Sequence, residues 1–148
     1  MILKLMLEGE IFIPGNVPSS KNSKVATKKG VFHSKTVMNY LRSLGIQHYS
    51  VTHKTVMGYK TKPNLFRQAF KDWEKPTEFI KLGLHFIRDS KRDADFTNIC
   101  QIIFDLMVAH DFIEDDSMRY VLPFPLEIDG EYFSYSKENP GVIIRVLN

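Results

Sequence analysis

Cysteine is nearly absent from this 148-residue chain, which contains only Cys100. A lone cysteine excludes an intramolecular disulfide and a zinc site built from cysteines, and it fits a reducing cytoplasm. Its place between apolar residues predicts a buried, inert thiol. The histidines show no H-x3-H spacing, which argues against zinc bound by histidines. P-loop, GxGxxG and GxSxG motifs are also absent, so we expect no nucleotide cofactor.

Long apolar runs are missing as well. No stretch of about 18 apolar residues occurs, so no membrane span is expected. The apolar start lacks a basic region and a cleavage site of small residues, which argues against a signal peptide and favours a cytoplasmic protein. Hydrophobic residues make up 43% and charged residues 25% of the chain, a composition that excludes intrinsic disorder. Without repeats or linkers, the length predicts one domain over residues 1–148.

Charge is distributed very unevenly along the chain. Residues 20–92 hold 16 Lys and Arg against 4 Asp and Glu, whereas residues 93–148 hold 3 against 11. The difference could merely reflect two solvated faces. It could also reflect a basic surface for a polyanion beside an acidic pocket for a cation, a combination that nucleic acid and a divalent metal would satisfy together.

Hydrophobic periodicity predicts an α+β fold, a single compact domain with a mixed β-sheet packed against helices. The predicted strands cover 2–13, 78–88, 118–122 and 142–147. The predicted helices cover 35–45, 63–73 and 96–110, with Ser34 and Asp95 as N-caps of the first and last. Residues 19–30 and 47–62 lack a clear period and are predicted to be loops. Asp129-Gly130 predicts a hairpin-like turn, and His85 is expected to be structural.

A group of acidic and amide residues is the most informative feature of the sequence. On the last helix, Asn98, Gln101 and Asp105 share one face, and Asp95 stands at the N-terminal end of that stripe. The helix leads into Glu114-Asp115-Asp116. An antiparallel strand that begins near Met118 could return Asp116 to the side of Asp95.

Clustered carboxylates suit a hard divalent cation such as magnesium, which binds one or two of them together with substrate phosphate and water. Each residue also has a simpler explanation. Asp95 could only cap its helix, and Asp93, Asp115 and Asp116 could be turn formers. Asp105 could be an ordinary polar residue on the helix surface.

At these residues the chain resembles the RusA family of Holliday junction resolvases, small endonucleases common in prophages. That family carries R-x-D-x-D-N, then a helix with a lysine and D-A-L, then a paired D-D. This sequence has Arg92-Asp93-Ala94-Asp95, then Asn98, Phe104-Asp105-Leu106 and Asp115-Asp116. The segments 13–15 and 18–22 resemble the Pro-Pro-Ser-x-Asn opening of the family, and 138–142 resembles its phage-type members.

The resemblance implies a RusA-like domain that resolves four-way DNA junctions by magnesium-dependent hydrolysis of a phosphodiester bond, with manganese as a second usable metal. Asp95 and Asp116 would bind the cation, Asp93 or Asp115 would complete its coordination, and Asp93, Asp95 and Asp116 would be the catalytic set. Asn98, Gln101 and Asp105 would lie next to these ligands. Branched DNA would contact Lys21, Asn22, Lys24, Lys28, Lys29, Lys35, Lys91 and Arg92, and the protein would act as a homodimer.

Two alignments of the motif remain open. If Asn98 sets the register, Asp95 takes the place of the first family aspartate and Thr97 that of the second. If the aspartates are matched instead, Asp93 and Asp95 are the ligands and two residues are inserted before Asn98. In the first alignment the helix lysine of the family becomes Gln101. A catalytically impaired protein that binds branched DNA without cleaving it is therefore the alternative, and an interaction domain unrelated to DNA is a third hypothesis.

Overall fold

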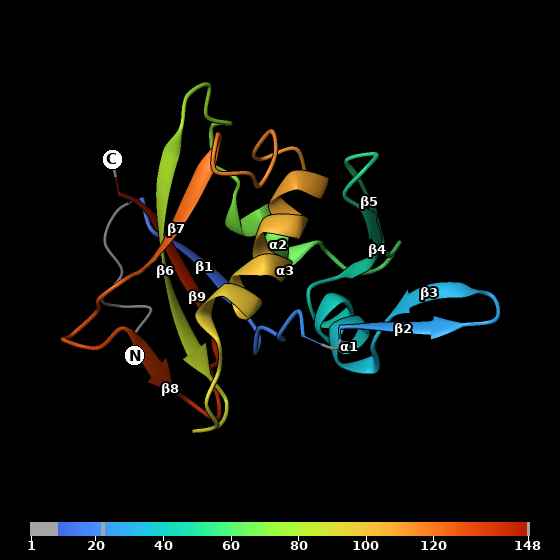
Figure 1. The fold of residues 1–148 in the computed structure, drawn as a ribbon, viewed down its shortest axis with the longest axis horizontal. Coiled ribbons are helices and arrows are strands. Elements are labelled where there is room, and N and C mark those ends of the chain that lie inside the picture. The colour runs from blue at the N-terminus through green and yellow to red at the C-terminus, as the bar shows by residue number, and fades with distance from the viewer. Residues whose placement is uncertain (1–8, 22, 148) are drawn as a thin grey trace.

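The structure is a computed structural model that describes residues 9–21 and 23–147. Figure 1 shows a sheet on one side, helices against it, and two hairpins on the far side of the helices. The strands are β1 (Ile11–Pro14), β2 (Lys24–Thr27), β3 (Gly30–His33), β4 (Ile46–Ser50), β5 (Thr55–Gly58), β6 (Ile80–Arg88), β7 (Val121–Pro125), β8 (Phe133–Tyr135) and β9 (Gly141–Val146). The helices are α1 (Lys35–Ser43), α2 (Leu65–Ala69) and α3 (Phe96–Ala109).

The main sheet is mixed and has the order β1-β9-β6-β7, with β8 beside the end of β6. Strand β6 is antiparallel to β9 and parallel to both β7 and β8. The predicted α+β fold in a single compact domain is therefore confirmed. Within the described ranges, no helix has the length and apolar character to cross a membrane.

Both faces of β6 are buried, although its alternating pattern predicts one apolar face. Leu82, Leu84 and Phe86 point into the main core beneath α3, as expected. On the other face lies His85, which is fully buried and forms hydrogen bonds to Leu126 O (2.8 Å) and Ser134 Oγ (2.6 Å). His85 thereby ties β6 to the segments around β7 and β8. Its expected structural role follows from these two bonds.

Helix α3 begins where its cap predicts and supplies much of the core. The Asp95 side chain accepts a hydrogen bond from Thr97 N, which satisfies an amide that the first turn leaves without a helical partner. Ser34 caps α1 in the same way through Val37 N. Cys100 is buried on α3, as predicted. This burial raises the pKa of its thiol to about 12, so the reactive thiolate form is disfavoured at neutral pH.

Two of the predicted loops contain hairpins. Strands β2 and β3 pair within and beyond predicted loop 19–30, and β4 and β5 pair over predicted loop 47–62, with β4 beginning one residue before it. All four β2 side chains are exposed, so no alternation of apolar and polar residues marks that strand. These hairpins project from α1 and α3, away from the sheet (Figure 1). The loop predictions were wrong at both places.

Other boundaries also differ from the expectations. Helix α2 is shorter than predicted helix 63–73 and begins after Asn64, whose side chain caps it through Arg67 N. Strand β7 begins at Val121 rather than near Met118, and it runs parallel to its neighbour β6. The predicted strand 2–13 corresponds to β1 at its end, and its first seven residues lie outside the described chain. The predicted turn at 129–130 is present, with a bridge between Ile128 and Glu131.

Candidate functional site

Gln101 joins two carboxylates on the exposed side of α3. Its Nε2 donates to Asp105 Oδ1 at 2.8 Å and to Asp116 Oδ2 at 2.9 Å. The two carboxylate oxygens therefore lie no more than 5.7 Å apart, because each accepts a hydrogen bond from the same nitrogen. Gln101 and Asp105 do share a helix face, as their spacing predicts. All three side chains are half-buried, so the pair has limited access to water.

The electrostatics of this pair follow from its burial. Burial raises the pKa of Asp105, and the negative charge of Asp116 raises it further. The Gln101 hydrogen bond and the positive charge of Lys24 act in the opposite direction. Asp105 is thus a carboxylate that would gain from a nearby cation, because a positive charge would offset both burial and repulsion.

Asp95 lies at the other end of the same helix stripe. Its Oδ1 accepts hydrogen bonds from the Thr97 backbone amide (3.0 Å) and the Thr97 hydroxyl (2.8 Å). The Thr97 side chain is the main reason that the pKa of Asp95 is lowered, and the charge of Lys21 contributes to the same shift. With a rise of 1.5 Å per residue, Asp95 stands about 9 Å along the helix axis from Gln101.

The predicted cation ligands do not form one close group in the described part of the chain. No set of three or more His, Cys, Asp or Glu side chains is positioned to hold a metal ion within residues 9–21 and 23–147. Asp93 and Asp115 are exposed in the segments before and after α3. The structure therefore brings Asp116 to Asp105 through Gln101, and the four-aspartate ligand set stays a prediction.

The two halves of the motif that carry the resemblance meet in space. Ser20, in the N-terminal segment, donates its backbone amide to Asn98 O at 2.8 Å, and its hydroxyl lies 3.4 Å from Asn98 Oδ1. Seventy-eight residues separate this pair in the chain. The Pro-Ser-Ser-Lys segment thus lies against the first turns of α3, beside the capping aspartate.

The predicted DNA-binding cations lie on both sides of the N-terminal end of α3. Lys21, Lys24, Lys28, Lys29 and Lys35 are exposed on the segment that contains the β2–β3 hairpin. We call this hairpin, residues 24–33, the basic arm; Figure 1 shows it extending away from the sheet. Lys91 and Arg92 lie in the turn between β6 and α3, where the Lys91 ammonium is 5.4 Å from the Tyr135 ring centre. Asn22 lies outside the described residues.

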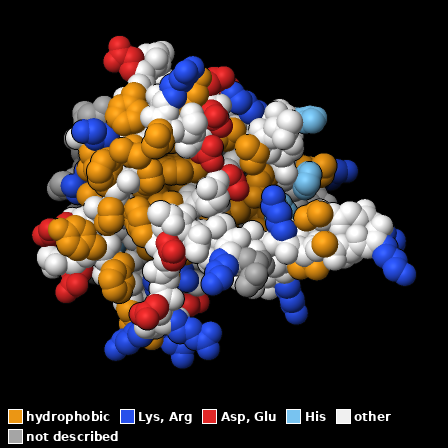
Figure 2. Space-filling model, in the orientation of Figure 1, with side chains coloured by type: hydrophobic (Ala, Val, Ile, Leu, Met, Phe, Trp, Pro, Cys, Tyr) orange, Lys and Arg blue, Asp and Glu red, His pale blue; other side chains and the backbone are white. Residues whose placement is uncertain are grey.

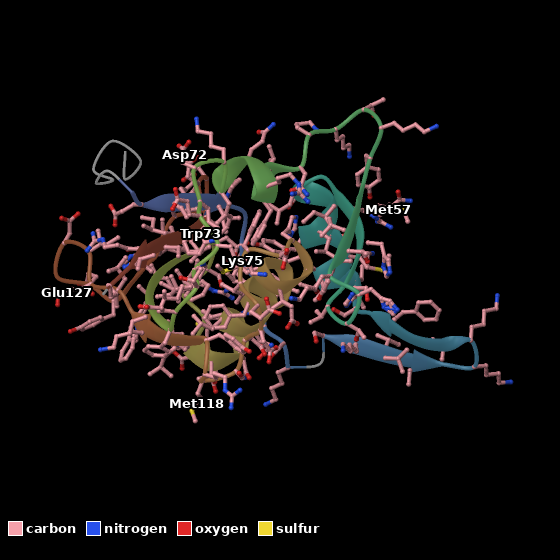
Figure 3. All side chains as sticks on the ribbon, turned by 90° about the horizontal axis from the view of Figure 1, so that it is seen from above. Met57, Asp72, Trp73, Lys75, Met118 and Glu127 are labelled. Carbon is pink, nitrogen blue, oxygen red and sulfur yellow. The ribbon has the colours of Figure 1, made fainter. Side chains whose placement is uncertain are left out.

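Part of the charge asymmetry is neutralised within the molecule. Lys75 is 2.8 Å from both Asp111 and Glu114, and Lys54 is 3.1 Å from Glu114 and 3.5 Å from Asp111. Figure 3 shows Lys75 beside Trp73, at the side of the molecule where α2 and α3 lie. Two acids of the turn 111–116 are thus paired with lysines of the basic half. The sequence pattern alone does not separate them from Asp115 and Asp116.

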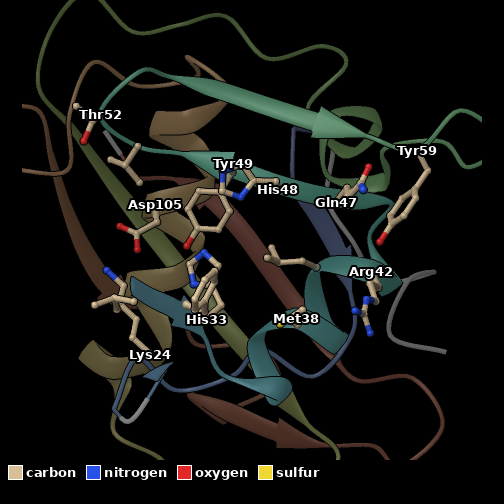
Figure 4. Close-up of a pocket in the computed structure, with 14 residues that line it drawn as sticks. Lys24, His33, Met38, Arg42, Gln47, His48, Tyr49, Thr52, Tyr59 and Asp105 are labelled. Atoms are coloured by element: carbon tan, nitrogen blue, oxygen red, sulfur yellow. The ribbon is translucent and has the colours of Figure 1, made fainter. Parts of the chain in front are cut away.

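A hollow of about 820 Å³ opens between the basic arm, α1, the β4–β5 hairpin and α3. Figure 4 shows Lys24, His33, Tyr49 and Asp105 pointing toward one another at one end, with Arg42, Gln47 and Tyr59 toward the other. The His33 and Tyr49 rings stack with centres 5.0 Å apart. Sequence reasoning missed this hollow because most of its walls come from segments without hydrophobic periodicity.

Burial dominates the chemistry of the ionisable groups in the hollow. It lowers the pKa of His33, and the charge of Lys24 and the neighbouring His48 add to that shift. It also raises the pKa of Tyr49, and Asp105 adds to that effect. His33 and Tyr49 are therefore neutral rings at pH 7, and Asp105 is the carboxylate that lines the hollow.

No protein-family model and no curated protein sequence matches this chain.

Proposed function

We propose that this protein binds branched DNA and cleaves it as a magnesium-dependent, structure-selective endonuclease of four-way junctions. The observation that carries the proposal is the convergence of Asp105 and Asp116 on Gln101, next to the basic segment that includes Lys21 and Lys24. The meeting of Ser20 with Asn98 supports it further, because it joins the two separate motifs of the resemblance.

The donor chemistry of the pair fits magnesium. Carboxylate oxygens are the preferred ligands, and one or two of them suffice when substrate phosphate and water complete the coordination. Asp105 and Asp116 would hold the ion, with Asp115, the neighbour of Asp116 in the chain, as a further carboxylate. Asp95 lies about 9 Å along the helix axis from Gln101, so it would stand outside the coordination of this ion. A bound ion would supply charge neutralisation at the phosphate and an activated water. Manganese, which also accepts oxygen ligands, would substitute for magnesium in this site.

The chain's own cations would bind the DNA backbone. Lysines of the basic arm, together with Lys21, Lys91 and Arg92, can contact phosphates on both sides of the N-terminal end of α3. Such contacts release counterions, so the logarithm of the affinity should fall linearly with the logarithm of salt concentration. Lys21 also places positive charge beside Asp95, which would draw a phosphate toward the carboxylates.

We also propose that the protein is a homodimer. Several large apolar side chains are exposed around β7 and β8, and Figure 2 shows hydrophobic side chains gathered over this side of the molecule. They are Met118, Phe124, Tyr132, Phe133 and Tyr135. Apolar surface of this kind is a typical subunit interface, and a two-fold dimer would present two matched sites to a two-fold symmetric junction. Sedimentation equilibrium of the wild type and of Phe133→Asp tests the pairing, since a charge there should shift the protein to monomer.

Binding without cleavage is the second candidate, and the site itself favours it in one respect. The Gln101 amide already satisfies both carboxylates, and Thr97 occupies the capping oxygen of Asp95. A neutral amide supplies no positive charge to a phosphate, unlike the lysine that the resemblance places there. Cleavage that appears only in Gln101→Lys would assign the wild type to this second class.

The decisive experiment incubates the protein with a labelled four-way junction in magnesium, in manganese and in EDTA. Nicking should require the metal and disappear in Asp116→Asn, whereas Asp129→Asn, at the exposed turn, should leave it intact. Junction binding without nicking in either metal would favour the binding protein. Absence of binding to any nucleic acid at low salt would favour an interaction domain unrelated to DNA.

A further inference from the structure

The hollow beside α3 has the lining of a stacking site for a nucleobase. Phe32, His33, Tyr49 and Tyr59 all line it. Phe32 keeps half of its surface exposed, although a phenylalanine is usually buried in a protein of this size. Aromatic rings on an open surface offer flat faces to an unpaired base, because every base has a π-face that can stack.

The positive charge around the hollow suits the phosphate of a nucleotide. Lys24 and Arg42 line it, and within the described residues neither forms an ion pair with a carboxylate at 4.0 Å or less. The chain from residue 11 to residue 71 contains no Asp or Glu at all. Every strand and helix from β2 to α2 therefore lacks carboxylates, and α3 contributes the single one that lines the hollow, Asp105.

Size restricts the occupant to a part of a DNA strand. A volume of about 820 Å³ lies within the range of roughly 300–1,000 Å³ that holds small ligands. A duplex is far wider than such a hollow, whereas a base that has left the stack can enter it. Polar groups on the walls, including Gln47 and Asp105, can form hydrogen bonds with the edge of that base (Figure 4).

We propose that this hollow receives one unpaired base of a DNA strand, with Phe32 as its stacking surface and Arg42 as a contact to the adjoining phosphate. This inference rests on the proposed function in taking DNA as the ligand. It adds a requirement that the function alone does not make, namely that an unpaired base is recognised in this hollow, which shares Asp105 with the Gln101-linked pair of carboxylates.

The test compares three labelled DNA duplexes that differ at one position: a bulged adenine, a bulged abasic residue and no bulge. Dissociation constants are measured by fluorescence anisotropy at fixed salt. EDTA is present, because it removes the metal and so prevents cleavage. We expect the adenine bulge to bind at least about fivefold more tightly than the abasic bulge, in keeping with the usual contribution of base–aromatic stacking. A 2-aminopurine in the bulge should change its fluorescence on binding.

Two exposed phenylalanines provide matched variants. Phe32→Ala should abolish the preference for the base, whereas Phe79→Ala, just before β6 of the main sheet and not among the residues that line the hollow, should preserve it. Both side chains are exposed, so both variants should fold, and circular dichroism checks this. Retention of the preference in Phe32→Ala, or its loss in both variants, would overturn the assignment of the base to this hollow.

The affinities of the wild type for the three duplexes also test the stacking site separately from DNA binding. Equal affinity of the wild type for all three duplexes would overturn the stacking site and leave the proposed DNA binding intact. No affinity for any of them would overturn the stacking site, and the four-way junction assay then decides separately whether the protein binds branched DNA. Free deoxyadenosine monophosphate should compete poorly, because it lacks the flanking phosphates that reach the basic arm. Competition by it as strong as that of the bulged duplex would instead assign the hollow to a free nucleotide.

Discussion

Asp105 and Asp116 accept hydrogen bonds from one and the same nitrogen, Nε2 of Gln101. Asp105 lies in mid-helix and Asp116 follows the acidic turn, so the amide links the helix to the segment that leads toward β7. Two half-buried carboxylates would repel each other without a donor between them. The amide is therefore the donor that bridges this pair.

Replacing Gln101 with leucine should raise the pKa of Asp105 further. The hydrogen bond from Gln101 lowers that pKa, and its removal leaves burial and the charge of Asp116 unopposed by a donor on α3. NMR titration of the Asp105 carboxyl measures the effect. The free energy of unfolding at pH 7 should fall by about 1–3 kcal/mol, the usual cost of removing a partner from a buried polar group. Gln68→Leu, at an exposed position of α2, is the control, and an Asp105 pKa unchanged in Gln101→Leu would contradict the prediction.

Acid should destabilise the protein through His110. Burial lowers the pKa of this histidine from 6.5 to about 4; Nδ1 bonds to Leu106 O, and Nε2 lies 3.0 Å from Asn64 Nδ2. The unfolded chain thus binds more protons than the folded chain between pH 4 and 6.5. The free energy of unfolding should fall as the pH drops through that window, by up to about 3 kcal/mol from this group.

Urea unfolding of wild type and His110→Gln at several pH values measures this contribution. The slope of stability against pH between 4 and 6.5 should decrease by the equivalent of one proton in His110→Gln. His53→Gln, at an exposed turn, should retain the slope of the wild type. An identical slope in wild type and His110→Gln would show that another group controls the acid response.

The turn after α1 should tolerate only glycine. Gly45 has a φ of +75°, and a Cβ added there would lie 2.0 Å from the backbone oxygen of Pro63. Gly130 has a similar φ of +81° but no atom within 4 Å of an added Cβ. Gly130→Ala should therefore lose about 1 kcal/mol from backbone strain alone, whereas Gly45→Ala should lose several times more. Thermal unfolding of both variants measures the difference, and equal losses would contradict the predicted steric clash.

The ion pairs between the basic and acidic halves should add little stability. Lys75 bridges Asp111 and Glu114 at the surface, where solvent screens the charges. Lys75→Met should lower the free energy of unfolding by less than about 1 kcal/mol, and 1 M salt should reduce the difference from the wild type. Lys71→Met, a neighbouring exposed lysine, is the control. A larger, salt-independent loss would mean that Lys75 contributes through packing instead.

Local patterns predict the central elements of the fold well. The alternation in β6 and the apolar spacing in α3 are strong because each element packs broadly against the core. The caps Ser34 and Asp95 were predicted for the same reason, since capping depends on residues next to each other in the chain. The two hairpins were missed because their pairing depends on cross-strand hydrogen bonds and their exposed residues carry no period.

The candidate site also has features that the sequence predicts and features that depend on tertiary packing. Sequence alone determined that Asn98, Gln101 and Asp105 share a helix face, because helical geometry sets that relation whatever surrounds the helix. It also determined the uneven distribution of charge. Only the tertiary structure decided that Asp116 joins Gln101, that Ser20 joins Asn98, and that an aromatic hollow opens beside Asp105. Those relations depend on how distant segments pack, and no spacing within one segment specifies the packing of another.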